Sequence, residues 1–337
     1  MLKNGRIRWI DNLKGFILLT VILYHAQVPW YVVRYVSSWF MPCFFLISGM
    51  LFELKENSVK QTCIHRVRTL LLPYFMLSIL FVFLNPNNYQ GDILHNFRVN
   101  AWDILMGNSG FMTVSLWFVY VLFEVCCVTA IGYYITKNLN SVARKLIFVL
   151  TLVSCLIADF FLFQTSLPFK LGDFFIAWFM YLLGYMLQSY IKRREEYQTL
   201  PDPPLKGGRM TLSNIYLIVS SLFLLSVAIA LHVWQSVDGT HKLFIRVPLL
   251  ICGSFSAMGV TYILSRTIPH NFIGNVLGYL SKNAMCLLAI HLWAICMLRQ
   301  YAPSNSPLFV AICALGISLL IMPICSRYFP WFVGQKR

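Results

Sequence analysis

Apolar runs long enough to cross a lipid bilayer recur from one end of the chain to the other, separated by short polar segments. A membrane-spanning helix needs about 20 mostly apolar residues. The pattern therefore predicts an all-α fold: a polytopic integral membrane protein with about ten transmembrane helices. We expect these near 13–33, 36–54, 67–84, 113–136, 146–165, 171–191, 212–234, 243–265, 273–298 and 307–328.

The composition agrees with this fold class. Hydrophobic residues make up 58% of the 337 residues and charged residues only 12%, about half the charged fraction of a soluble domain. Ten cysteines are present, most of them inside apolar runs and none in a C-x-x-C pair. Such cysteines are typical of small core residues, so they favour neither a disulfide framework nor a metal site.

The net charge of +15 comes from cations scattered over the short connections between the apolar runs. Connections that follow even-numbered spans, together with both termini, carry most of these cations. Because positive residues concentrate on the cytoplasmic side of a membrane, we expect both termini in the cytoplasm. The charge then reports topology, and nucleic acid is not an expected partner.

Two connections are long. Segment 85–112 mixes polar residues with aromatic ones and is expected outside, as an interfacial helix, an acceptor-binding loop or an ordinary solvated loop. Segment 192–210 contains three prolines and is expected to be a cytoplasmic linker. It would join helices 1–6 (about 9–191) to helices 7–10 (about 211–329) within a single membrane-embedded domain covering 1–337.

The first apolar run, RWIDNLKGFILLTVILYH (8–25), carries ionisable groups that are costly to bury. His25 lies eleven positions after Lys14, which on a helix is about three turns, so the two share one face about 16 Å apart. Asp11, three residues before Lys14, can pair with it. Either Lys14 marks a cytoplasmic anion site and His25 a buried proton acceptor, or Lys14 snorkels to headgroups and His25 hydrogen-bonds in the core.

Other polar residues inside apolar runs are candidates for substrate contacts. Glu124 lies in the same run as Trp117, and can orient His25 or bind acceptor hydroxyls. His291 follows Ser281 and Asn283 in the least hydrophobic run, and these three can line an acceptor route. A G-x-S-x-G elbow, a Walker motif, a dinucleotide fingerprint and a His/Cys metal cluster are all lacking in the sequence.

Several motifs, in order along the chain, resemble those of the acyltransferase-3 family. They are Arg8-x-x-Asp11 followed by Lys14 and His25, then PCFFLISGMLF (42–52), HRVRTLLLPYF (65–75), SLWFVYVLFE (115–124) and LGYLSKNAMCLLAIH (277–291). The last resembles the fucose 4-O-acetylase branch.

The resemblance implies a multi-pass enzyme of a bacterial-type inner (plasma) membrane, with membrane lipid around it. Such an enzyme moves an acetyl group from cytoplasmic acetyl-CoA, without a metal, to a hydroxyl of a cell-surface or exported carbohydrate. His25 is implied as the catalytic histidine, and Lys14 and Arg68 as donor-binding residues. Glu124 departs from the family pattern, since it lies farther from Trp117 than the family's acid does.

The chemistry of the residues fits this expectation. A sugar hydroxyl attacks a thioester once a base takes its proton, and an imidazole suits that role near neutral pH. The phosphates of coenzyme A call for cations, and Arg8, Arg66 and Arg68 join Lys14 as candidates, although Arg66 and Arg68 also fit simple positive-inside anchoring. Two alternatives stay open: a transporter or flippase of a glycan precursor, and a family member that transfers succinyl or another acyl group.

Overall fold

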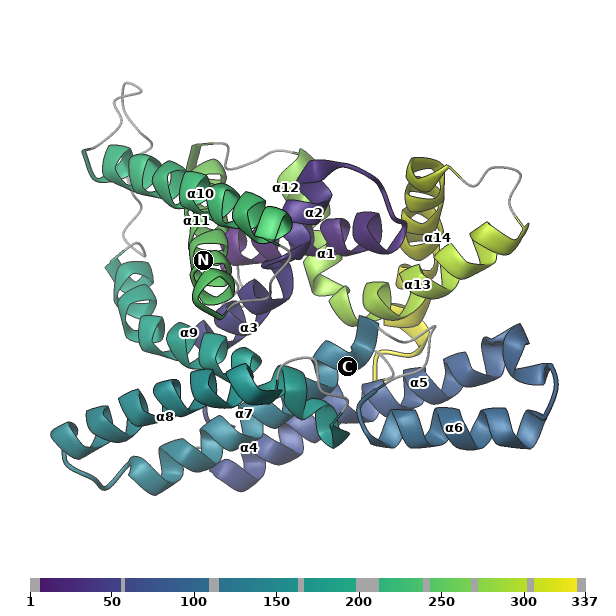
Figure 1. The fold of residues 1–337 in the computed structure, drawn as a ribbon, viewed down its shortest axis with the longest axis horizontal. Coiled ribbons are helices and arrows are strands. Elements are labelled where there is room, and N and C mark those ends of the chain that lie inside the picture. Colours follow the sequence, from purple (N-terminus) through teal and green to yellow (C-terminus); the bar gives the residue numbers. More distant parts are fainter. Residues whose placement is uncertain are drawn as a thin grey trace. The chain divides into compact units, whose positions relative to one another are not determined.

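The computed structural model describes residues 7–55, 58–108, 115–162, 167–197, 212–238, 243–267, 272–301 and 306–331. Helices account for nearly all of these residues, and no strand occurs among them (Figure 1). The chain divides into two compact units. Unit 1 comprises Met1–Tyr24, Pro29–Leu51 and Leu183–Ala284, and unit 2 comprises His25–Val28, Phe52–Leu182 and Met285–Arg337.

Unit 1 is a group of helices that pack closely where glycines allow it. Its helices are α1 (Arg8–His25, up to Tyr24), α2 (Tyr31–Ser37), α3 (Phe40–Met50), the second part of α9 (Leu171–Tyr197), α10 (Leu212–Asp238), α11 (Leu243–Thr267) and α12 (Phe272–Lys282). A Cβ on Gly15 of α1 would overlap the backbone of Leu277 in α12, and one on Gly259 of α11 would overlap Ser221 in α10. Small residues at these crossings let the backbones approach, as is common in membrane helices.

Unit 2 contains the remaining helices: α4 (Val59–Arg66), the π-helical turn η2 (Val67–Leu71), α5 (Leu72–Leu84), η3 (Pro86–Tyr89), α6 (Ile93–Leu105), α7 (Trp117–Thr136), α8 (Ser141–Leu162), η5 (Pro168–Lys170), the first part of α9, α13 (Ala284–Tyr301) and α14 (Pro307–Tyr328). α4 packs against α7, and α5 packs against α6. The buried Tyr74 hydroxyl donates to the carbonyl of Ile104, which ties α5 to α6.

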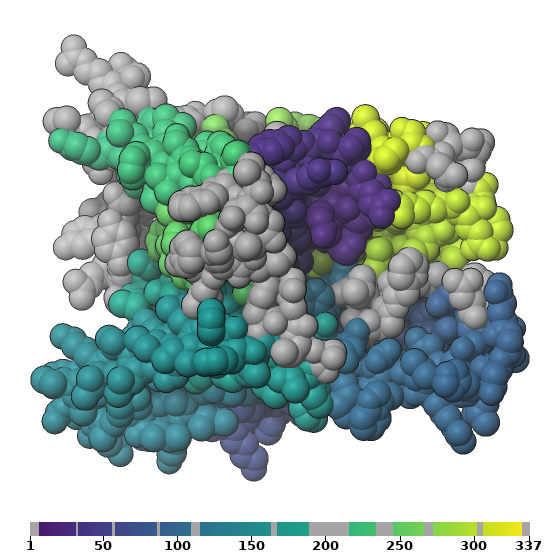
Figure 2. Space-filling model, viewed as in Figure 1, coloured from purple at the N-terminus to yellow at the C-terminus, as the bar shows by residue number. Residues whose placement is uncertain are grey.

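Eight helical segments of the described chain are long and apolar enough to cross a membrane. They are Val59–Leu84, Trp117–Thr136, Ser141–Leu162, Pro168–Gln188, Tyr216–Val233, Ile245–Ser265, Ala284–Tyr301 and Pro307–Tyr328. On α8, the large apolar side chains of Val142 and Phe161 are more than 70% exposed, as lipid-facing residues are. Figure 1 labels this helix, and the teal region of Figure 2 shows that part of unit 2 at the surface. The chain is therefore an all-α polytopic membrane protein. The total of ten spans and the cytoplasmic termini stay predictions.

Several predicted boundaries are wrong. The first helix runs from Arg8 to His25 instead of 13–33, because Gln27 takes a left-handed conformation (φ 58°) and Pro29 follows. The second is shorter than 36–54, since α3 spans only Phe40–Met50. The predicted helix 273–298 is two helices, because the chain breaks between α12 and α13 at Asn283.

The structure tests the predictions for the two long connections to different extents. Segment 85–112 contains a true helix, α6, so an ordinary loop is wrong for Ile93–Leu105; its interfacial position stays a prediction. Asp92 caps α6 by accepting from the backbone N–H of His95 at 3.0 Å. The predicted linker 192–210 begins inside α9, which continues to Tyr197, and its remainder lies outside the described residues.

Candidate functional site

Two histidines from distant parts of the sequence meet in unit 2. His25 ends α1, and His291 lies in the middle of α13; their ring centroids are 5.4 Å apart with the planes tilted by 49°. His25 is half-buried and His291 is fully buried. The fold therefore joins two residues that the sequence predicted separately, one as a base and one as a substrate contact.

Hydrogen bonding determines which nitrogen of His291 can act as a base. Nδ1 of His291 lies 2.8 Å from the carbonyl oxygen of Leu287, one turn earlier on α13. A carbonyl only accepts, so Nδ1 carries a proton, and the neutral ring then has its lone pair on Nε2. Nε2 is buried and has no hydrogen-bond partner among the described residues. His291 thus presents a free nitrogen in the centre that also contains His25.

The start of α7 is fixed beside this centre. The buried Ser115 hydroxyl donates to the carbonyl of Leu288 at 2.7 Å, three residues before His291. This bond ties the residue two positions before Trp117, the first residue of α7, to α13. Sequence reasoning missed Ser115 as a positioning residue. Its only signal was its place directly before the quoted Leu-Trp-Phe element.

Glu124 lies two turns after Trp117 on α7, close to the same face of the helix. It is half-buried, its Oε2 atom is buried without a hydrogen-bond partner in the described part of the chain, and its charge acts on Tyr120 of the same helix. The role of Glu124 in orienting His25 stays a prediction.

In unit 1, Asp11 and Ser281 form a bond across 270 residues of sequence. The Ser281 hydroxyl of α12 donates to Oδ1 of Asp11 on α1 at 3.1 Å. Asn283 follows Ser281 at the break after α12, and its side-chain amide donates to the Tyr279 carbonyl at 3.0 Å. Ser281 thus lies at the contact between α12 and α1, and Asn283 lies just after the end of α12. Their contact with the acceptor stays a prediction.

Arg66 and Arg68 differ in burial, although the sequence analysis named both as candidates for binding the donor. Arg66 ends α4 and is half-buried, whereas Arg68 lies in η2 and is exposed. The π-helical turn precedes Pro73, which lacks the N–H that the Thr69 carbonyl would need in an α-helix. The wider turn accommodates that loss, and such turns are frequent at functional sites.

Arg66 is the last residue of α4, a helix that packs against α7. Its charge acts on the Cys126 thiol of α7 and the Tyr181 hydroxyl of α9, two groups that lie 3.3 Å apart. Its Nε atom is buried and has no hydrogen-bond partner among the described residues. A buried guanidinium donor without an acceptor fits the binding of an anionic group.

The two predicted donor-binding residues of α1 lie in unit 1. Arg8 is the first residue of the helix and Lys14 follows it by about one and a half turns; both are half-buried. Lys14 and His25 both lie within the continuous helix α1, as the predicted helical spacing requires. Whether these cations contact a donor molecule stays a prediction.

Comparison with protein-family models gives the class of the chain. The model of the acyltransferase-3 family, described as an acyltransferase domain, matches residues 7–327. The chain therefore belongs to this family and is a membrane acyltransferase. Comparisons with curated proteins and with solved structures find no significant match. The fucose 4-O-acetylase branch stays a prediction.

Proposed function

We propose that the chain is an O-acetyltransferase of a bacterial inner (plasma) membrane. It transfers an acetyl group from cytoplasmic acetyl-CoA to a hydroxyl of a cell-surface or exported carbohydrate. The contact between His25 and His291 supports this proposal most directly, because it brings together two imidazoles, the residue type best suited to take a hydroxyl proton near neutral pH.

The proposed reaction is a direct transfer. As a histidine takes the proton of the sugar hydroxyl, the hydroxyl oxygen bonds to the carbonyl carbon of the thioester. The carbon–sulfur bond then breaks, and the coenzyme leaves as a thiolate that receives a proton. His25 is the base, and the free Nε2 of His291 places a second proton acceptor within the same centre.

Cations supply the predicted sites for the donor's phosphates. In unit 2, Arg66 fits this role because its buried Nε lacks an acceptor among the described residues, and the exposed Arg68 can bind phosphate at the surface. Lys14 and Arg8 are the corresponding cations of unit 1. Trp117, with its start of α7 held by Ser115, is proposed to contact the carbohydrate.

The test is acetyl transfer by the purified protein in proteoliposomes. The vesicles receive acetyl-CoA labelled in the acetyl group and a glycan extract as the acceptor, and mass spectrometry follows ester formation. We expect one acetyl per modified sugar, formed only with active protein. Transfer from succinyl-CoA in preference to acetyl-CoA would overturn the choice of donor, and movement of glycan without any ester would overturn the transferase.

A further inference from the structure

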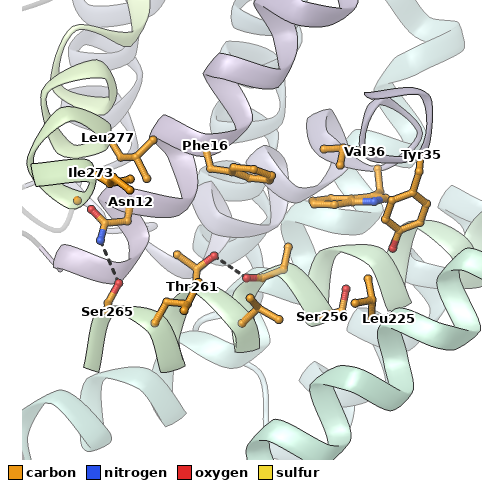
Figure 3. Close-up of a pocket in the computed structure, with 15 residues that line it drawn as sticks. Asn12, Phe16, Tyr35, Val36, Leu225, Ser256, Thr261, Ser265, Ile273 and Leu277 are labelled. Carbon is orange, nitrogen blue, oxygen red and sulfur yellow. Dashed lines mark hydrogen bonds between the residues drawn. The ribbon is translucent and has the colours of Figure 1, made fainter. Parts of the chain in front are cut away.

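The described part of unit 1 contains a pocket of about 410 Å³ that no step of the proposed transfer reaction uses. Its lining comes from α1, the α2–α3 segment and helices α10, α11 and α12, all within unit 1 (Figure 3). A volume of this size lies within the range of sites that hold small molecules. The pocket is therefore a candidate for a second binding site.

The pocket and the proposed base lie on different faces of α1. Asn12 and Phe16 line the pocket, and because they are four residues apart they share one face of the helix. Lys14 is two residues from each of them, about 200° around the helix axis, and His25 lies on the face of Lys14. A ligand in the pocket thus contacts the side of α1 opposite to the proposed base and its cation.

Three side chains of the lining have a buried polar atom without a hydrogen-bond partner among the described residues. These atoms are Oδ1 of Asn12, the hydroxyl of Tyr35 and Nε1 of Trp39, and the three residues are only 8%, 6% and 3% exposed. Burying a polar group without a partner costs free energy, and such groups are rare in folded proteins. Three of them around one pocket indicate an occupant that supplies the missing hydrogen bonds.

The chemistry of these three atoms defines the polar part of the occupant. An indole N–H only donates, so Trp39 requires an acceptor on the ligand. Asn12 already donates through its amide nitrogen to the Ser265 hydroxyl at 3.0 Å, and its free oxygen only accepts, so it requires a donor. The Tyr35 hydroxyl can do either. A hydroxyl is the smallest uncharged group that meets both requirements.

Tyr35 and Trp39 form one polar part of the lining. Their ring centroids are 6.0 Å apart, and Ser256 is a further polar neighbour of the Tyr35 hydroxyl. Neither neighbour forms a well-aligned hydrogen bond with that hydroxyl, and the Ser256 hydroxyl donates instead to the Gly253 carbonyl at 2.9 Å. A ligand oxygen at this place can accept from Trp39 and bond to Tyr35.

Asn12 forms a second polar part of the lining. Its partner Ser265 follows Ser256 by nine residues on α11, which corresponds to about 13 Å along the helix axis. Figure 3 shows Asn12 and Tyr35 on opposite sides of the view. A single ligand that reaches both parts therefore has polar groups at two separate positions.

The rest of the lining requires an uncharged and largely apolar ligand. None of the fifteen described lining residues carries a charged side chain, so an ionised ligand would be buried there without a counter-charge. Most of them, including Phe16, Val36, Leu225, Val260 and Leu277, present apolar side chains. Water fills such a pocket poorly, because a buried water needs two to four polar partners and most of this lining offers none.

From these observations we propose that the pocket binds an uncharged lipid alcohol with oxygen-containing groups at two positions. One oxygen accepts from Trp39, a hydroxyl donates to Asn12, and the apolar part between them packs against the remaining lining. This inference does not depend on the transfer reaction, since it concerns other residues and another ligand.

Photolabelling with matched probes tests the proposal. The full chain in phosphatidylcholine vesicles is irradiated with a twelve-carbon α,ω-diol that carries a diazirine at the middle of its chain, and labelled peptides are mapped by mass spectrometry. The matched probes are the alkane and the α,ω-dicarboxylate of the same length. We expect saturable labelling of the pocket residues of α11 by the diol, displaced by unlabelled diol and at least tenfold stronger than with either matched probe.

Three results would overturn the proposal. Labelling by the alkane as strong as that by the diol would show that hydrogen bonds do not select the ligand. A lack of saturable labelling by the diol would leave water as the partner of the three polar atoms. Displacement of the diol by coenzyme A would assign the pocket to the uncharged arm of the donor. Because the assay needs no acyl donor, failure of the proposed transferase activity would not change its outcome.

Conservative variants test the individual hydrogen bonds. Tyr35→Phe and Trp39→Phe each remove one hydrogen-bonding group and keep an aromatic ring, and we expect each to raise the half-saturating diol concentration by about 3- to 10-fold. Tyr216→Phe is the matched control, because Tyr216 is 72% exposed on α10, and it should bind the diol as the wild type does. Unchanged binding in both Tyr35→Phe and Trp39→Phe would also overturn the proposal.

Discussion

The rings of His25 and His291 lie 5.4 Å apart, at the end of one helix and the middle of another that is 266 residues later in sequence. Because the Leu287 carbonyl holds Nδ1 of His291, the nitrogen left without a hydrogen-bond partner among the described residues is the buried Nε2. Two consequences follow. His291 belongs with the proposed base, and its two nitrogens have separable roles.

Substituting His291 separates these roles. His291→Asn keeps a side-chain N–H able to donate to the Leu287 carbonyl and removes Nε2. We expect its transfer rate to fall by about 10²-fold or more, the usual contribution of proton-transfer groups, with little change in melting temperature. A rate within threefold of the wild type would show that Nε2 has no part in the reaction, and a large loss of melting temperature would point to a structural role.

Arg66 is expected to act on donor binding. Arg66→Gln removes the charge, and we expect KM for acetyl-CoA to rise about 10-fold, as for a lost bond to a charged group, with kcat nearly unchanged. Steady-state kinetics over a range of donor concentrations measure this. Arg144→Gln is the matched control, because Arg144 is exposed at the start of α8 and bonds to nearby backbone carbonyls. Equal effects of the two variants would contradict a specific role for Arg66.

The bond between Asp11 and Ser281 predicts a difference between two conservative changes. Ser281→Ala removes the donor and should lower the free energy of unfolding by about 1 kcal/mol. Asp11→Asn keeps an oxygen that can accept from Ser281, so it should cost less stability while it removes the charge. Unfolding in mixed micelles measures both, and Ser326→Ala, at a half-buried serine bonded within its own helix, is the control. Asp11→Asn costing more than Ser281→Ala would contradict the assigned bond.

Two glycines at neighbouring helices should respond in opposite ways to the same substitution. A Cβ at Gly15 would overlap the Leu277 backbone, so Gly15→Ala should destabilise the protein by about 1–3 kcal/mol, as overpacking does. A Cβ at Gly278 meets open space, and Gly278→Ala should be neutral or stabilising by up to about 1 kcal/mol through helix propensity. Thermal unfolding compares the two, and equal melting temperatures would contradict the α1–α12 contact.

The hydropathy pattern was enough to predict the all-α membrane fold and the positions of the long apolar helices. α8, α10 and α14, for example, begin or end within a few residues of the predicted spans. Hydropathy did not predict where helices with polar ends begin or break. Arg8 and Asp11 lie in the first turns of α1 although the predicted span begins after them, and the break at Asn283 is a local turn inside an apolar run.

The candidate site was predictable residue by residue but not as an arrangement. His25 and His291 each stood out as ionisable groups in apolar runs. Their contact, like that of Asp11 with Ser281, depends on how distant helices pack, and one sequence contains no record of such pairings. Ser115 could not be identified because a serine at a helix start is ordinary, and only its bond to Leu288 distinguishes it.

The central claim is that His25 takes the proton of the acceptor hydroxyl, and its most direct test is the acetyl-transfer rate of His25→Ala in proteoliposomes. His95→Ala is the control, since His95 is an exposed histidine on α6. With equal amounts of folded protein, we predict a loss of at least about 10²-fold for His25→Ala and an unchanged rate for His95→Ala. A His25→Ala rate within twofold of the wild type would contradict the account.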